Sequence, residues 1–260
     1  MGLSAPRAAH PCASTLREQG VRRQLRNRRA DREGSPDLAT LCRDWRLLFI
    51  HGRRTGSTAV RDALHEHLAG EEIPAERELS PDGQRIIVAR HSTLPVLMQQ
   101  RLITPEERAG LTVFTAVRNP FDDLISMWQK NRDIVAGTLE RPEQIMTPAR
   151  VRQLEFSATH TFPEWIAHRW GRKGLAGRFK PHPVDAFAHT EGVDRVLRFE
   201  TLQEDLNALL KDIGHDGAIE LPRVNVTEGR RHYREYYTDA ARRTVEQAWR
   251  GELDRYGYSF

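Results

Sequence analysis

Several features that place a chain in a common functional class are missing from this sequence. Only two cysteines, Cys12 and Cys42, occur among 260 residues, so neither a disulfide framework nor a cysteine-rich metal site is expected. No apolar run is long enough to span a bilayer, and residues 1–40 lack the apolar centre of a secretory signal. We therefore expect a soluble, cytoplasmic protein with no inserted membrane segment.

A strong charge of either sign is also missing. The 40 Lys and Arg against 36 Asp and Glu give a formal net charge of +4 at pH 7. The arginines are spread along the chain, so nucleic acid is not an expected partner, whereas a small anionic ligand is compatible with the mild excess. Residues 1–40 are polar and rich in arginine, which predicts an N-terminal arm followed by a single domain at 41–260.

Short apolar runs bounded by turn or charged residues predict strands at 47–50, 85–89, 111–117 and 195–199. Helical spacing is present at 59–68, 94–102, 121–135 and 142–170, and from Tyr237 to the end with Thr238 as N-cap. Strands that alternate with helices predict an α/β fold, a three-layer sandwich whose central parallel sheet is flanked by helices.

One loop stands out between a strand and a helix, in the segment LLFIHGRRTGSTAV at 47–60. Gly52 and Gly56 permit a tight turn, and the first backbone N–H groups of the next helix can face an anion. The Walker pattern G-x-x-x-x-G-K-[ST] is absent, because the loop is one residue too short and has no lysine before its hydroxyl. Taken alone, the segment fits an anion site and an ordinary capped turn equally well.

A second segment, FTAVRNPFDDLISMWQK at 114–130, places Arg118 where a predicted strand ends. That is the carboxyl edge of the sheet, where open α/β folds bind ligands. Ser126 follows two turns into the next helix. Taken alone, the segment could also be a solvated loop in which Asp122 or Asp123 pairs with a neighbouring arginine.

Together the two segments resemble the sulfotransferase superfamily that uses 3′-phosphoadenosine-5′-phosphosulfate (PAPS). Its members carry the patterns F-I-H-x-P-K-T-G-G-T and V-R-N/D-P-x-x-R-x-x-S, to which FIHGRRTGST and VRNPFDDLIS correspond. RIIVARHST, VLRFETLQEDL, LPRVNVTEGRRHYREYY and ELDRYGYSF are similar to later family segments, so the resemblance covers about residues 46–260. It implies a P-loop NTPase-like sulfotransferase fold, with PAPS as co-substrate and adenosine 3′,5′-bisphosphate (PAP) as product.

The resemblance also implies the roles of individual residues. The loop holds the 5′-phosphosulfate, and Arg118 and Ser126 match residues that read the 3′-phosphate. His91 is the candidate base for an acceptor hydroxyl or amine, with Glu76 or Glu78 as alternatives, and no metal is expected. The donor-binding residues implied are Arg53, Arg54, Thr55, Gly56, Ser57, Thr58, Arg118 and Ser126.

Three positions depart from the family patterns. Arg54 stands where many members have lysine, and it can stabilise charge on the departing phosphate as a fixed forked donor without acting as an acid. Arg53 replaces a proline, and either contacts the donor or faces solvent. Asp123 replaces a common arginine, which predicts a weaker grip on the 3′-phosphate.

We therefore expect an enzyme that moves a sulfuryl group from PAPS to a small-molecule, lipid or saccharide acceptor. Two alternatives stay open: a nucleotide kinase or NTPase with a degenerate phosphate loop, and a non-catalytic nucleotide-binding scaffold on the same fold. The sequence specifies neither the acceptor nor the oligomeric state.

Overall fold

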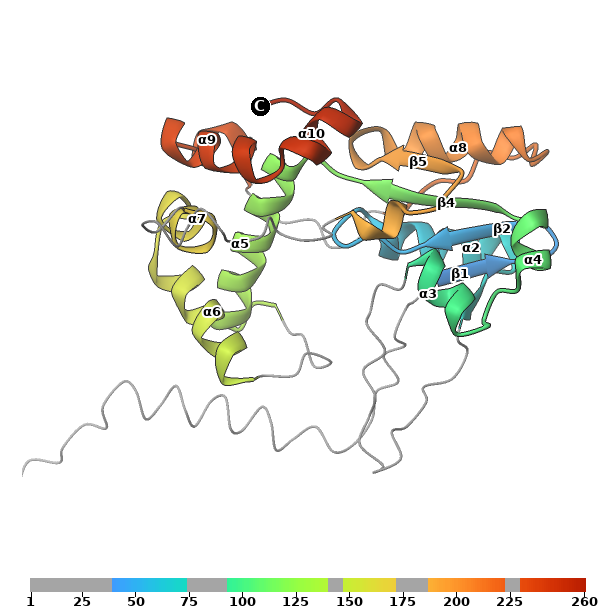
Figure 1. Cartoon of the computed structure of the whole chain (residues 1–260), viewed down its shortest axis with the longest axis horizontal. Coiled ribbons are helices and arrows are strands. Elements are labelled where there is room, and N and C mark those ends of the chain that lie inside the picture. Colours follow the sequence, from blue (N-terminus) through green and yellow to red (C-terminus); the bar gives the residue numbers. More distant parts are fainter. Residues whose placement is uncertain (1–38, 74–92, 140–146, 172–186, 223–229) are drawn as a thin grey trace, which may run out of the picture. The chain divides into compact units, whose positions relative to one another are not determined.

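The computed structural model describes residues 39–73, 93–139, 147–171, 187–222 and 230–260 (Figure 1). These belong to one compact unit, formed by residues 36–140 and 146–260. The strands are β1 (Ala39–Cys42), β2 (Leu47–Ile50), β3 (Glu71–Ile73), β4 (Thr112–Val117) and β5 (Arg195–Arg198). The α-helices are α2 (Ser57–Leu68), α3 (Leu94–Gln99), α4 (Pro105–Gly110), α5 (Pro120–Ala136), α6 (Pro148–Thr159), α7 (Phe162–Trp170), α8 (Leu202–Asp212), α9 (Asp239–Ala248) and α10 (Arg250–Tyr256). Short 3-10 turns are η2 (Ala188–Thr190), η3 (Phe199–Thr201) and η4 (Tyr233–Tyr236).

The five strands form one sheet in the order β3-β1-β2-β4-β5. β2, β4 and β5 are parallel, as expected, but β1 is antiparallel to both of its neighbours, so the sheet is mixed and not parallel throughout. The reason is local: only residues 43–46 join β1 to β2, and so short a connection can form a hairpin but not a crossover. β1 begins at Ala39, two residues inside the segment that the sequence analysis assigned to the arm.

Side chains of the central strand β2 alternate between two apolar layers. Leu47 and Phe49 pack in the cluster formed with α2 and α8, whereas Leu48 and Ile50 pack in the cluster that contains Leu97 of α3. A strand buried on both faces is a continuous apolar run, which explains why β2 was found from the sequence with its bounds correct. The sheet between two helical layers confirms the expected α/β fold class.

A third apolar cluster joins α5, α7, α9 and α10, all of which follow β4 in the chain. The expected helix at 142–170 is divided into α6 and α7, because Thr161 starts a new helix with Glu164 in a capping box. The expected long final helix is likewise divided, at the buried Trp249, into α9 and α10. Thr238 is the N-cap of α9, as predicted, and accepts a hydrogen bond from the backbone N of Ala241 at 3.3 Å.

Several sequence predictions fall outside the described residues, namely the strand at 85–89, the candidate bases His91, Glu76 and Glu78, and most of the arm. The strands expected at 111–117 and 195–199 are confirmed to within one residue as β4 and β5. Among the helices that the structure describes, none combines the length and the apolar character needed to cross a bilayer.

Candidate functional site

Three polar segments meet at the carboxyl edge of the sheet. β2, β4 and β5 are adjacent and parallel, so the segments that follow them emerge at the same edge. Arg118, after β4, donates from Nη1 to the backbone O of Arg54 at 3.1 Å, in the loop after β2. The backbone N of Asn119 donates to Oε1 of Glu200 at 2.8 Å, in the turn after β5. The two segments singled out in the sequence are therefore in direct contact.

The loop after β2 depends on its glycines. A Cβ atom at Gly52 would lie 2.7 Å from the backbone O of Ala116, so only glycine lets the loop lie this close to β4. Gly56 has φ 80° and forms the N-cap of α2, a conformation that glycine adopts at little cost. Glycine at these two positions therefore gives the loop the backbone conformation that an anion-binding loop needs.

Hydroxyl groups of the loop hold its own backbone. Thr55 Oγ1 and Ser57 Oγ donate to the backbone O of Gly52, at 3.1 Å and 2.6 Å. Thr55 is buried, whereas Ser57 and Thr58 are half-buried at the first turn of α2. No side chain caps this helix, so its first N–H groups have no side-chain partner at the cap. Backbone donors and the helix dipole at this point favour an anion.

Arg54 makes a forked ion pair across the site. Its Nε donates to Oδ1 of Asp123 at 2.5 Å, and its Nη2 donates to Oδ2 at 2.6 Å. The two side chains are 21% and 20% exposed, so solvent screens the pair less than it would a surface pair. Burial disfavours the charged guanidinium, but the charge and hydrogen bonds of Asp123 outweigh it, and the pKa of Arg54 is raised. Arg53, one residue earlier, is exposed.

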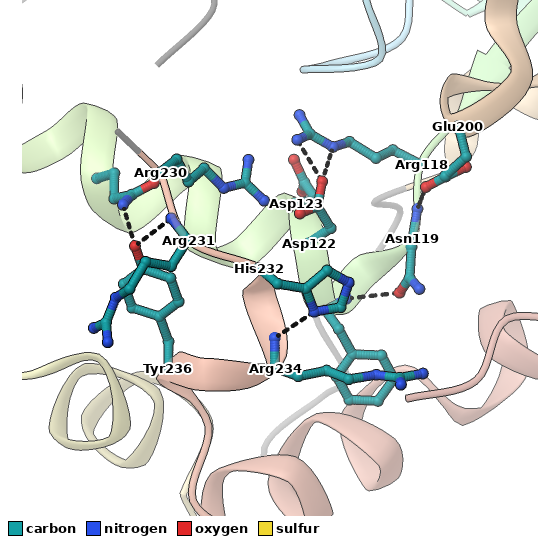
Figure 2. Close-up of polar contacts among 12 residues, drawn as sticks. Arg118, Asn119, Asp122, Asp123, Glu200, Arg230, Arg231, His232, Arg234 and Tyr236 are labelled. Atoms are coloured by element: carbon teal, nitrogen blue, oxygen red, sulfur yellow. Dashed lines mark hydrogen bonds and ion pairs between the residues drawn. The ribbon is translucent and has the colours of Figure 1, made fainter. Parts of the chain in front are cut away.

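Two further arginines form ion pairs with Asp122. Arg118 donates to its Oδ2 from Nε at 2.8 Å and from Nη2 at 2.5 Å, and Arg230 forms an ion pair with its Oδ1. The guanidinium groups of Arg118 and Arg230 approach this carboxylate from opposite sides in Figure 2. Arg118 also lies over the ring of Phe199, 4.1 Å from its centroid. Burial lowers the pKa of Arg118 and Arg230, and each guanidinium nevertheless stays protonated at neutral pH.

Asp122 and Asp123 each pair with an arginine, as the sequence allowed for one of them. Arg230 had no role predicted from the sequence, although it lies in the segment LPRVNVTEGRRHYREYY that contributed to the resemblance. The adjacent Arg230 and Arg231 were the available signal. Nothing in the sequence shows that Arg230 approaches the segment after β4. Ser126 is buried on α5, one turn beyond Asp122 on the same side of the helix.

Two histidines near the loop are part of the core. His51 is buried, and its Nε2 forms a 2.8 Å hydrogen bond with the hydroxyl of Thr40. His189 is also buried and donates from Nε2 to the backbone O of Ala116 at 3.0 Å. Burial is the main cause of a lowered pKa at His189, so it is neutral near pH 7. Both side chains stabilise the edge of the sheet.

Comparison with known protein families gives a match over most of the chain. A family model described as "Sulfotransferase family" matches residues 70–259, which is most of the chain and includes Arg118, Ser126, Asp123 and Arg230. The loop at residues 51–58 precedes the matched range. No curated protein and no solved structure matches the chain.

Proposed function

The chain belongs to the sulfotransferase family, and on that premise we propose that it transfers a sulfuryl group from PAPS to a hydroxyl or amine of a small-molecule, lipid or saccharide acceptor. The observation that carries the proposal is the hydrogen bond between Arg118 Nη1 and the backbone O of Arg54. It joins the loop that resembles the family's 5′-phosphosulfate element to the segment that resembles its 3′-phosphate element, and a donor with an anionic group at each end would contact both segments.

The residues present fit such a donor. The uncapped start of α2 supplies backbone donors, and Arg54, Arg118 and Arg230 supply three positive charges, which the carboxylates of Asp122, Asp123 and Glu200 offset. The guanidinium N–H donors and the oriented helix dipole favour phosphate and sulfate over a neutral ligand. We assign the 5′ end to the loop residues Arg54 to Thr58 and the 3′-phosphate to Arg118 and Ser126, with Arg230 as an addition suggested by its position, and we assign the exposed Arg53 to the solvent side of the loop.

PAPS supplies an activated sulfuryl group, and the protein's task is to position it and to stabilise charge. In the proposed reaction His91 takes the proton from the acceptor as the acceptor oxygen or nitrogen bonds to sulfur. Arg54 and the N–H groups of α2 stabilise the negative charge that the 5′-phosphate gains when its bond to sulfur breaks. Arg118 holds the 3′-phosphate and keeps the donor aligned.

The 3′-phosphate provides the test of this assignment. PAP at about a thousand times its Kd should stabilise the protein by roughly 4 kcal/mol, and AMP at the same concentration should stabilise it much less. The missing phosphate of AMP is the partner expected for Arg118, so Arg118→Ala should remove most of the difference between the two ligands. Thermal unfolding with each ligand, referred to each variant's own ligand-free Tm, measures both effects.

Arg108→Ala is the matched control for that experiment. Arg108 also forms an ion pair, with Asp194 at 2.7 Å, although its side chain is 22% exposed against 9% for Arg118, and it lies in α4, before the start of β4 and not at its carboxyl end. We expect this variant to keep the preference for PAP over AMP. Equal shifts with PAP and AMP in the wild-type protein would overturn the donor assignment, and PAP binding without turnover of any acceptor would favour the scaffold alternative.

Metal dependence separates the proposal from a kinase or NTPase. The loop lacks the Walker lysine, and phosphoryl-transfer enzymes of that class need Mg²⁺ to bridge the phosphates. Turnover of PAPS should therefore be unchanged by excess EDTA in the assay. Activity that EDTA abolishes and Mg²⁺ restores, together with consumption of ATP, would return the chain to the kinase alternative.

A further inference from the structure

Arg54 occupies an unusual backbone position. Its φ is 58°, in the left-handed region that non-glycine residues rarely adopt, and the next turn of chain is fixed by the hydroxyl contacts to Gly52. The side chain leaves this position toward α5 and meets Asp123 with two parallel hydrogen bonds. A forked pair fixes the orientation of the guanidinium plane as well as its position.

The fork leaves Arg54 able to bind a ligand. A guanidinium has five N–H donors, and Asp123 takes one from Nε and one from Nη2. Among the described residues no side chain accepts from either N–H group of Nη1 or from the second of Nη2, so three donors are left. The pair therefore orients these three donors without consuming the group.

The neighbouring carboxylate, that of Asp122, binds different arginines. Asp122 is engaged by Arg118 and Arg230, while Asp123 is engaged by Arg54. Asp123 is hydrogen-bonded to the loop after β2, whereas Asp122 binds the strand end and the segment before η4. The charge of Asp123 also acts on Arg118, so loss of that charge affects both ends of the donor site, but loss of the forked hydrogen bonds affects Arg54 alone.

We propose that Asp123 is a positioning residue that orients Arg54 for sulfuryl transfer, at the cost of a negative charge that weakens donor binding. This inference rests on the proposed function. Its physical basis is that Asp123 raises the rate of sulfuryl transfer and lowers the affinity for the donor. It aims the Arg54 donors at the group on which charge develops in the transition state, and it repels an anionic donor in every state.

Asp123→Asn gives the decisive measurement, because asparagine keeps the size of the side chain and removes its charge. We expect PAP to bind about three- to tenfold more tightly, since one nearby negative charge is gone. The single-turnover rate at saturating PAPS should fall by about tenfold, because Arg54 loses its charged forked partner. Isothermal titration with PAP and rapid-quench kinetics with PAPS measure the two quantities. Asp123→Glu keeps the charge and should recover part of the rate.

Two further variants separate positioning from a merely structural role. The exchange Arg54→Asp with Asp123→Arg keeps an ion pair at this place, and aspartate tolerates the left-handed backbone better than arginine does. Its Tm should be close to that of wild type while the rate stays low, because position 54 of the loop then carries no cation. Asp133→Asn removes a carboxylate about 15 Å farther along α5 and should change neither binding nor rate.

The outcomes distinguish the inference from the function on which it rests. If wild-type protein fails to bind PAP, the proposed function is wrong. If wild-type protein binds PAP and Asp123→Asn keeps the normal rate, the positioning role is wrong. Weaker binding and a slower rate in parallel, accompanied by a lower Tm, would show that Asp123 only holds the fold together.

Discussion

Replacing Arg54 by alanine should lower the single-turnover rate at saturating PAPS by about 30- to 1000-fold, which corresponds to roughly 2–4 kcal/mol of transition-state stabilisation. The physical reason is the position of the residue. Arg54 lies in the loop before α2, is largely shielded from solvent, and is oriented by Asp123. A preorganised cation in such a site stabilises charge on the departing phosphate more than water does.

Lysine at the same position provides the conservative comparison. Arg54→Lys keeps the charge but cannot form the fork with Asp123, so we expect a rate between those of wild type and Arg54→Ala. Arg53→Ala is the matched control, because it removes the same charge from the adjacent but exposed position. Its effect should be much smaller. If Arg53→Ala is the slow variant and Arg54→Ala turns over at a nearly normal rate, the correspondence between this loop and the family pattern is wrong by one residue.

His91→Ala is the second variant with a large expected effect. Its kcat should fall by roughly a hundredfold or more, while the Kd for PAP changes little, because loss of a base affects the transition state more than donor binding. His91 and the alternatives Glu76 and Glu78 lie outside the described residues, so this prediction comes from the resemblance. The structure argues against two other histidines as the base. His51 is buried and hydrogen-bonded to Thr40, and His189 is buried and hydrogen-bonded to the backbone O of Ala116.

The pH dependence provides an independent readout of the base. A histidine base must be neutral to accept a proton, so kcat/KM of the wild-type enzyme should fall as pH falls through the pKa of that histidine. His91→Ala should lose this acidic limb and show a low rate at every pH. His189→Gln is the comparison, and it should keep the limb because its burial already favours the neutral form. A near-normal rate in His91→Ala would move the role of base to Glu76 or Glu78, which are then tested in the same way.

The sequence predicted best those elements whose signal is local. β2, β4 and α5 are long or strongly apolar, and each was found within two residues of its observed bounds. β1 (ATLC) and β3 (EEI) were missed because neither is a continuous apolar run: β1 contains a threonine, and β3 has only three residues, two of them glutamates. Their strand conformation comes from pairing with β2 and with each other, which is tertiary information.

The sequence predicted the segments that form the site but not which of their side chains pair with one another. The segments at 51–58 and 114–130 could be recognised because glycines, hydroxyls and arginines follow strands in a known order. The sequence indicated that Asp123 could pair with an arginine. It could not identify Arg54 as the partner, because the two residues are 69 positions apart. For the same reason Arg230, whose partner Asp122 lies in another part of the chain, was missed.

The hydrogen bonds that join the three strand ends also determine when the site can form during folding. They connect residues separated by 64 positions (Arg54 and Arg118) and by 81 positions (Asn119 and Glu200), whereas the β1–β2 hairpin closes over four residues. Contacts of such long range form only after a large loss of chain entropy, so a partly folded chain can hold the hairpin without any donor site. On the proposed function, binding of PAP would therefore report the fraction of molecules that have completed the sheet, and it could serve as an assay of refolding yield.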